Sequence, residues 1–181
     1  KFAEFLGASR GEAFVPRIST HRITENTEII LIEPPCGSNT TIIKSRGKFL
    51  FVDTGYACYR EEMLAILKNL IPDFNSMKKT ALITHADLDH CGLLSEFDEV
   101  IASHKSAQCI RSEYEGNGGY REKLPLHKPY VNICKILTSY KPVDPQKIAV
   151  PWQDIEDLKQ PLTQIGFFDF EELHFEVYEG K

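Results

Sequence analysis

Runs of apolar and β-branched residues in the first part of the chain predict strands. Residues 28 to 33 and 40 to 43 form two such runs, and the stretch between them, from Pro34 to Asn39, is rich in turn-forming residues. The two runs therefore predict a pair of strands arranged like a hairpin. Residues 48 to 52 form a third run and predict a buried strand.

Apolar residues then recur at helical spacing, and two further apolar runs follow. Pro72 predicts the end of this helix, and residues 80 to 84 and 99 to 103 predict short strands. Because strands and a helix alternate, the sequence predicts an α/β architecture, in which chemistry is expected in loops at the carboxyl ends of strands. The apolar positions of the predicted helix are Met63, Leu64, Ile66, Leu67 and Leu70.

Prolines and glycines interrupt the pattern in the second half of the chain. We interpret residues 114 to 162, approximately, as an irregular helical insertion within a single domain of residues 1–181. The elements expected in this half are a helix from 104 to about 113, short helices near 130–138 and 152–159, and a strand from 173 to 178.

Composition and charge exclude several classes of protein. The 181 residues are 42% hydrophobic and 26% charged, as in a globular domain, and no apolar run approaches the roughly 18 residues of a membrane helix. The net charge of −5 gives no reason to expect nucleic acid or anionic membranes as partners. The five cysteines form no CxxC pair, which favours reduced thiols and a cytoplasmic location.

Four potential metal ligands lie within six residues of one another, directly after the strand predicted at 80–84. They are His85, Asp87, Asp89 and His90, and Gly92 allows the chain to turn sharply after them. Imidazole and carboxylate ligands together suit Zn²⁺, Fe or Mn²⁺ better than Ca²⁺. The sequence therefore predicts a metal site in this loop.

Two other interpretations of the loop are open. In the first, these side chains only cap and solvate a loop before a short helix at 92–97, with Asp89 as the N-cap. The second is a calcium-binding loop, although the preceding residues predict a strand where that motif requires a helix. The residues that match the calcium pattern are Asp87, Asp89, Cys91, Gly92 and Asp98.

Residues 84–92 resemble the His-x-His-x-Asp-His signature of the metallo-β-lactamase superfamily. Residues 49–55, some thirty positions upstream, are similar to the strand and turn that precede this signature in the family. The resemblance implies a metallo-β-lactamase-like αβ/βα sandwich, half of it in this chain. It also implies one or two divalent metal ions, zinc first, with iron or manganese as the alternatives.

The resemblance also implies a role for each residue of the loop. His85 would bind the first metal, while Asp89 and His90 would bind the second. Asp87 stands where the family has its second histidine, and an oxygen ligand there favours a harder metal such as Mn²⁺ or Fe. We expect Asp89 to be the catalytic residue that orients the nucleophile and accepts its proton. Asp53 would lie beneath the site and orient the ligands.

The implied function is hydrolysis of a small-molecule ester, thioester, amide or phosphoester by a metal-activated water. The alternative is a degenerate, non-catalytic domain of the same fold that binds proteins, because Asp87 departs from the signature. The family's next ligand, in a Gly-His turn, is not found up to Lys181. We therefore expect a second chain, or a missing C-terminal half, to complete the fold.

Two further residues are candidates for lining the site. His104 follows a predicted strand on the side of the metal loop, but a helix-start or surface histidine is the alternative interpretation. Cys91 adjoins the loop and could be a redox-sensitive thiol, a ligand or simply a small buried residue.

Overall fold

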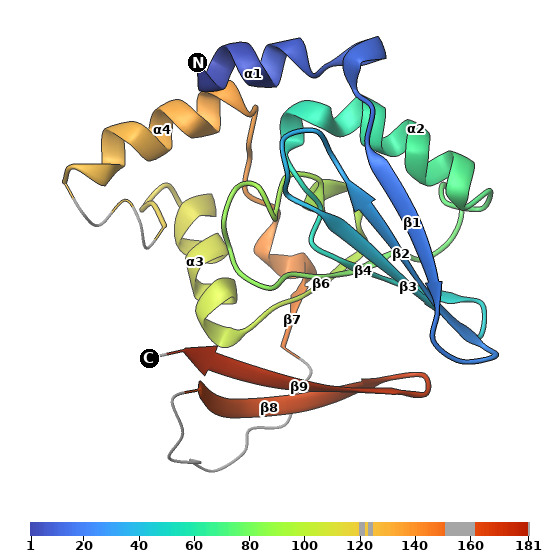
Figure 1. The fold of residues 1–181 in the computed structure, drawn as a ribbon. Helices are drawn as coiled ribbons and strands as arrows, with labels where there is room; N and C mark the ends of the chain where they lie inside the picture. Colours follow the sequence, from blue (N-terminus) through green and yellow to red (C-terminus); the bar gives the residue numbers. More distant parts are fainter. Residues whose placement is uncertain (120–121, 123–124, 151–161, 181) are drawn as a thin grey trace.

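The computed structural model describes residues 1–119, 122, 125–150 and 162–180. A sheet of seven strands forms its centre, and Figure 1 shows the elements arranged around it. The strands follow the chain order from β1 to β7 across the sheet, and β8 and β9 form a separate two-stranded sheet. Helices cover one side of the large sheet, and the β8–β9 hairpin lies on the other (Figure 1). The α/β class is confirmed.

The first four strands form an antiparallel meander. These strands are β1 (Arg17–Arg22), β2 (Thr27–Glu33), β3 (Thr40–Ser45) and β4 (Lys48–Val52). In the register, Ile30 pairs with Ile42, which in turn pairs with Phe51. The hairpin-like pair and the strand expected at 48–52 are confirmed.

The second part of the sheet is parallel. Each connection must therefore return the chain from the carboxyl end of one strand to the amino end of the next. Strands β5 (Thr80–Leu82), β6 (Glu99–Ile101) and β7 (Ile148–Ala149) pair in parallel with β4 and with one another. Helix α2 (Arg60–Leu70) connects β4 to β5 and ends just before Pro72, as its periodicity predicts. The carboxyl ends of β4 and β5 therefore meet at one edge of the sheet.

Successive residues of a strand point to opposite faces, so the sheet builds two apolar layers. On one face Ile42 and Phe51 pack in the main core with Met63 and Leu67 of α2. On the other face Ile43 and Leu50 pack against the hairpin. The hairpin comprises β8 (Leu162–Phe170) and β9 (Leu173–Gly180).

Polar contacts at the turn of the hairpin fix it to the large sheet. Glu172 accepts a hydrogen bond of 2.5 Å from Thr27 Oγ1 and lies 3.5 Å from a guanidinium nitrogen of Arg46. Glu171 pairs with Lys48. The strand expected at 173–178 is confirmed as part of β9, and its pairing with β8 covers the second face of the sheet.

The remaining helices lie on the side of the sheet opposite the hairpin (Figure 1). The side chain of Ser103 caps α3 by accepting a hydrogen bond of 3.0 Å from the backbone of Ser106. These helices are α1 (Phe2–Ala8), α3 (His104–Tyr114) and α4 (His127–Leu137), with 3₁₀ turns at Gly11–Ala13, Ala57–Tyr59, Leu94–Glu96 and Pro145–Lys147.

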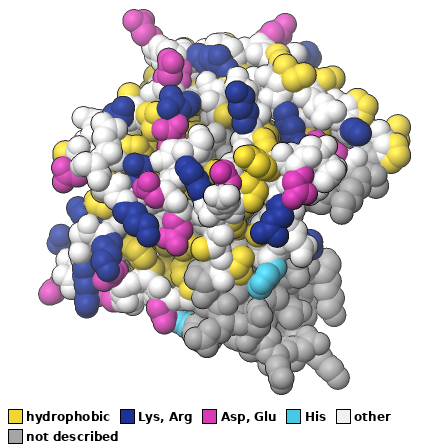
Figure 2. Space-filling model, turned by 180° about the vertical axis from the view of Figure 1, so that it is seen from behind, with side chains coloured by type: hydrophobic (Ala, Val, Ile, Leu, Met, Phe, Trp, Pro, Cys, Tyr) yellow, Lys and Arg dark blue, Asp and Glu magenta, His cyan; other side chains and the backbone are white. Residues whose placement is uncertain are grey.

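The region expected to be an irregular insertion contributes to the main fold. Helix α4 begins three residues before the predicted position, and β7 extends the large sheet. The helix expected at 152–159 lies outside the described residues. Within the described ranges, no helix is long and apolar enough to cross a membrane. Basic and acidic side chains are intermingled on the face seen in Figure 2.

Candidate metal centre

The predicted metal loop starts at the carboxyl end of β5, next to the residues that follow β4. The backbone nitrogen of Asp53 donates a hydrogen bond of 2.8 Å to the carbonyl of Leu82, which continues the pairing of the two strands. Asp53 then adopts a left-handed backbone conformation with φ of 57°. This turn places its carboxylate beneath the loop that begins at Thr84.

The carboxylate of Asp53 is buried and accepts three hydrogen bonds. Thr84 donates two of them, from its backbone nitrogen to Oδ1 and from its hydroxyl to Oδ2, each at 2.8 Å. His90 Nδ1 donates the third to Oδ2, also at 2.8 Å. Asp53 therefore holds both ends of the loop through Thr84 and His90.

The two histidines of the loop are held in the same manner. The Thr84 hydroxyl donates to Asp53, so it accepts from His85 Nδ1 at 3.0 Å. In both histidines Nδ1 is thus occupied, and Nε2 faces a carboxylate: His85 lies 3.3 Å from Asp87 Oδ2, and His90 lies 3.4 Å from Asp89 Oδ2. The two imidazole rings are 4.0 Å apart between centroids.

The donor chemistry of the loop fits divalent metal ions as two nitrogen–oxygen pairs. Holding Nδ1 by a hydrogen bond and leaving Nε2 for the ion is the usual arrangement of a ligating histidine. His85 with Asp87 forms one pair, and His90 with Asp89 forms the other. Among the described residues, no three His, Cys, Asp or Glu side chains converge as a single metal-binding group.

The electrostatics of the loop side chains favour an ionised pair of His90 and Asp89. Burial acts to lower the pKa of His90, but the hydrogen bonds with Asp53 and Asp89 outweigh it and raise the pKa to about 10. Burial acts to raise the pKa of Asp89, but the interactions with His90 and the Ser38 hydroxyl bring it below its ordinary value. Ser38 Oγ donates to Asp89 Oδ2 at 3.0 Å.

Several residues that position the loop escaped the sequence analysis. Thr54 uses its hydroxyl to donate to the carbonyl of His90 at 3.0 Å and to accept from the backbone of Leu93 at 3.1 Å. Ser38 and Thr84 hold Asp89 and Asp53, as described above. The only sequence signal was indirect: Thr54 and Thr84 lie inside the two segments that carry the family resemblance, and Ser38 lies in the turn before β3.

The other candidates are placed away from ligand positions. His104 is the exposed first residue of α3, which agrees with the helix-start interpretation. Cys91 is 2% exposed and its thiol contacts the carbonyl of His85 at 3.6 Å. Burial raises the pKa of the Cys91 thiol well above its ordinary value, which suppresses the reactive thiolate.

The structure contradicts one feature of each alternative interpretation of the loop. The 3₁₀ turn that follows the loop begins after Leu93 and has no side-chain cap, so Asp89 is not an N-cap. The calcium pattern requires a preceding helix, and the loop instead follows β5. Asp98, its last position, accepts a hydrogen bond of 2.8 Å from the backbone of Lys79.

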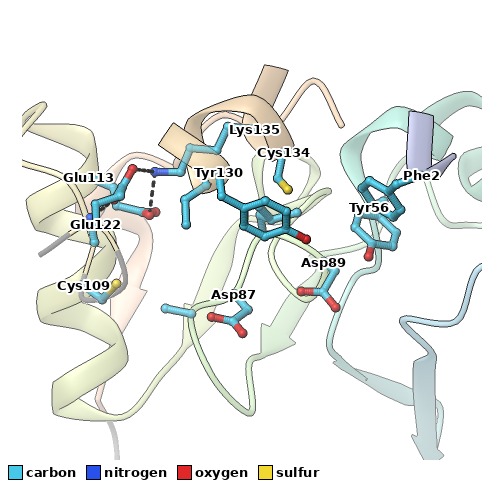
Figure 3. Close-up of a pocket in the computed structure, with 14 residues that line it drawn as sticks. Phe2, Tyr56, Asp87, Asp89, Cys109, Glu113, Glu122, Tyr130, Cys134 and Lys135 are labelled. Atoms are coloured by element: carbon cyan, nitrogen blue, oxygen red, sulfur yellow. Dashed lines mark hydrogen bonds and ion pairs between the residues drawn. The ribbon is translucent and has the colours of Figure 1, made fainter. Parts of the chain in front are cut away.

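A cavity of about 330 Å³ opens beside the loop (Figure 3). Glu113, Glu122 and Lys135 lie at one end and Phe2 and Tyr56 at the other, with Asp87 and Asp89 between them. This volume is within the range of small-molecule sites, roughly 300–1,000 Å³. The cavity therefore offers space for a small molecule next to the predicted metal ligands.

One lysine joins the elements at the far end of this cavity. The ammonium of Lys135, on α4, lies 2.9 Å from Glu113 of α3 and 2.6 Å from Glu122. The second oxygen of Glu113 accepts a hydrogen bond of 2.8 Å from the hydroxyl of Tyr140. The side chains of Glu113 and Glu122 are each only 7% exposed, so Lys135 is a shared counter-charge for two carboxylates that are largely shielded from water.

Replacing Lys135 with methionine is expected to lower the free energy of unfolding by about 3 kcal/mol, because two shielded carboxylates lose their counter-charge. This is the lower end of the usual range, since Lys135 is itself 20% exposed. Urea unfolding followed by circular dichroism measures the change. The control is Lys68→Met, an exposed position of α2. Equal stability of the two variants would contradict the role of this ion pair.

Comparisons with known proteins agree with the fold. The model of the metallo-beta-lactamase superfamily matches residues 34–173. A variant of the flavo di-iron protein from Thermotoga maritima aligns with a TM-score of 0.51 at 16% identity, over 91% of this chain and 40% of that one. The Rm3 metallo-beta-lactamase aligns with a TM-score of 0.51 at 15% identity, over 99% of this chain and 65% of that one.

The extent of these matches limits what each of them supports. At such identities the two solved structures support a common fold, and the chain spans less than two thirds of either protein. No curated protein sequence matches the chain. The family model, in contrast, covers well over half of the chain and includes both segments whose resemblance was noted. The chain belongs to the metallo-β-lactamase superfamily.

Proposed function

We propose that the chain carries the metal-binding loop of a metal-dependent hydrolase that acts on an ester, thioester, amide or phosphoester. The observation that carries the proposal is the common arrangement of the two loop histidines. Each has Nδ1 held from behind and Nε2 turned toward a carboxylate, so His85 with Asp87 and His90 with Asp89 would supply two ligands each.

When bound, one or two divalent ions would supply an activated water and a Lewis acid. The chain's own residues would orient the nucleophile, accept its proton and bind the substrate. Asp89, anchored through Ser38, is placed to orient the nucleophile and to accept its proton at the carboxylate. Asp53 would fix the imidazole of His90, and the adjoining cavity would hold the substrate. Zinc is the first candidate, and the oxygen ligand Asp87 makes iron and manganese the alternatives.

Zinc titration of the purified chain, followed by isothermal calorimetry, tests the metal site. His90→Ala and His85→Ala are each expected to weaken zinc binding about 100-fold or more, because each removes one nitrogen ligand from a pair. His21→Ala is the control, since His21 is an exposed residue of the edge strand β1. Unchanged affinity in the His85 variant would reject the nitrogen–oxygen pairs and return the loop to oxygen-only coordination.

The hydrolase proposal is tested separately from metal binding. The zinc-, iron- and manganese-loaded chain would be assayed with 4-nitrophenyl acetate, a thioester and bis(4-nitrophenyl) phosphate. Turnover of one class that is lost in Asp89→Asn, with zinc still bound, would support Asp89 as the catalytic residue. Metal binding without turnover of any class would favour the non-catalytic, protein-binding alternative.

A further inference from the structure

The cavity beside the metal loop has an aromatic rim. Tyr56 and Phe2 lie at one side with their ring centroids 6.3 Å apart, and Tyr130 extends from α4 on the other side toward Asp89 (Figure 3). Phe2 is 39% exposed and Tyr130 is 68% exposed. Large aromatic side chains grouped around a concave site are characteristic of surfaces that bind an apolar group.

The far end of the cavity has more hydrogen-bond acceptors than donors. A carboxylate has about four acceptor positions and an ammonium has three donors. Glu113 accepts from Lys135 and Tyr140, and Glu122 accepts from Lys135 and the backbone of Gly119. Roughly four acceptor positions on the two carboxylates are therefore left for a ligand, against about one donor on Lys135.

The charges that line the cavity also favour a cationic ligand over an anionic one. Four carboxylates face it, and Lys135 is the one cation among its described lining residues. Lys128 also acts on Glu122, but it is an exposed residue outside the lining and is screened by solvent. A divalent ion at the loop would offset Asp87 and Asp89, so among the described lining residues the net negative charge would remain at the end formed by Glu113 and Glu122.

We propose that this cavity is the substrate pocket and that it selects molecules with an aromatic or similar apolar body whose remote end is cationic rather than anionic. The body would lie between Tyr130 and the Phe2–Tyr56 pair, and the remote end would reach Glu113 and Glu122. The inference rests on the proposed function in one respect, the placement of the reacting group at Asp87 and Asp89.

Three probes of one shape test this selectivity without requiring hydrolysis. They are 4-phenylbutylamine, 4-phenylbutanol and 4-phenylbutyrate, titrated calorimetrically into the chain after removal of metals by a chelator, so that the carboxylate probe cannot bind a metal. We expect the amine to bind about tenfold more tightly than the carboxylate, with the alcohol between them. Equal or tighter binding of the carboxylate, or no binding of any probe, would overturn the proposal.

Two variants locate the ends of the bound probe. Tyr130→Ala is expected to weaken all three probes by a similar factor, whereas Tyr114→Ala, another exposed tyrosine but on α3 and outside the lining, changes none of them. Glu122→Gln is expected to weaken only the amine, and its unchanged binding of the alcohol shows that the cavity is intact. An amine that is unaffected by Glu122→Gln would be bound at Asp87 and Asp89 instead, which contradicts the proposed orientation.

The outcome is independent of the hydrolase assay. A preference for the amine in a chain that hydrolyses no substrate would leave the pocket assignment standing and remove only the catalytic role. Conversely, hydrolysis by a chain that shows no preference among the probes would support the proposed function and reject this specificity.

Discussion

Gly92→Ala is expected to lower the free energy of unfolding by about 4 kcal/mol or more, which would make it one of the most damaging single changes in the chain. A Cβ atom at this position would lie 2.2 Å from the backbone nitrogen of Ala57, 2.4 Å from the carbonyl oxygen of Gly55 and 2.5 Å from the carbonyl carbon of Tyr56. All three are backbone atoms, so no rotation of a side chain relieves the contact.

The close approach at Gly92 joins the metal loop to the segment after β4. The backbone nitrogen of Gly92 donates a hydrogen bond of 2.9 Å to Gly55, and the backbone nitrogen of Thr54 donates one of 2.9 Å to His90. A shift that makes room for a methyl group must break this contact and displace His90. We therefore expect the alanine variant to lose zinc affinity together with stability.

Urea unfolding of the metal-free chain measures the stability change, and calorimetric zinc titration measures the second effect. Gly7→Ala is the matched control, because Gly7 lies in α1 with no atom within 4 Å of the position of the added Cβ. That control is expected to be neutral or to stabilise the chain by up to about 1 kcal/mol, the helical preference of alanine over glycine. A Gly92 variant as stable as the Gly7 variant would contradict the close packing.

The elements that sequence analysis predicted are those with a clearly buried face, where apolar and polar side chains are separated. Strands β2 to β4 and helix α2 bury one or both faces, so their apolar residues repeat with the period of the element. Strand β1 was missed because it is an edge strand with almost all of its side chains exposed, and its sequence carries no apolar alternation. Its position follows from pairing with β2, which depends on the whole sheet.

The sequence pattern singled out the residues of the candidate loop but not the residues that position them. The loop residues are contiguous, so the order of His85, Asp87, Asp89 and His90 carries the signal by itself. Ser38 and Asp89, in contrast, are 51 positions apart in the chain, and Thr84 and Asp53 are 31 apart. Such contacts form only when the sheet brings loops from distant parts of the chain to the same edge, and a sequence pattern does not encode which polar residue will be there.

The cavity is harder to predict from the sequence than the loop is. Its rim and floor come from α1, α3, α4 and the residues after β4, and these segments contain no common motif. Lys135 was part of a predicted helix, but only the packing of α4 beside α3 brings its ammonium between Glu113 and Glu122. The specificity proposed for the cavity could therefore be argued only from the three-dimensional arrangement.

Asp53→Ala is expected to destabilise the chain by about 5 kcal/mol, because three hydrogen-bond donors in a part-buried site lose their acceptor and each loss costs about 1–3 kcal/mol. The exposed fraction of Asp53 is 7%, so water replaces the carboxylate poorly. Its backbone φ of 57° adds about 1 kcal/mol, since alanine disfavours the left-handed region. Asp98→Ala, which removes one exposed hydrogen bond to Lys79, is the control and is expected to cost about 1 kcal/mol.

Asp53→Asn separates the support of the fold from the orientation of the ligand. Asparagine tolerates the left-handed conformation and its amide oxygen can still accept from Thr84, so we expect about half of the stability loss of the alanine variant. It lacks the charge that fixes the imidazole of His90, and zinc affinity is expected to fall about 10- to 100-fold. If the asparagine variant kept full zinc affinity while the alanine variant unfolded readily, Asp53 would only hold the two strand ends together, and the position of His90 would have to depend on its own backbone contacts with Thr54.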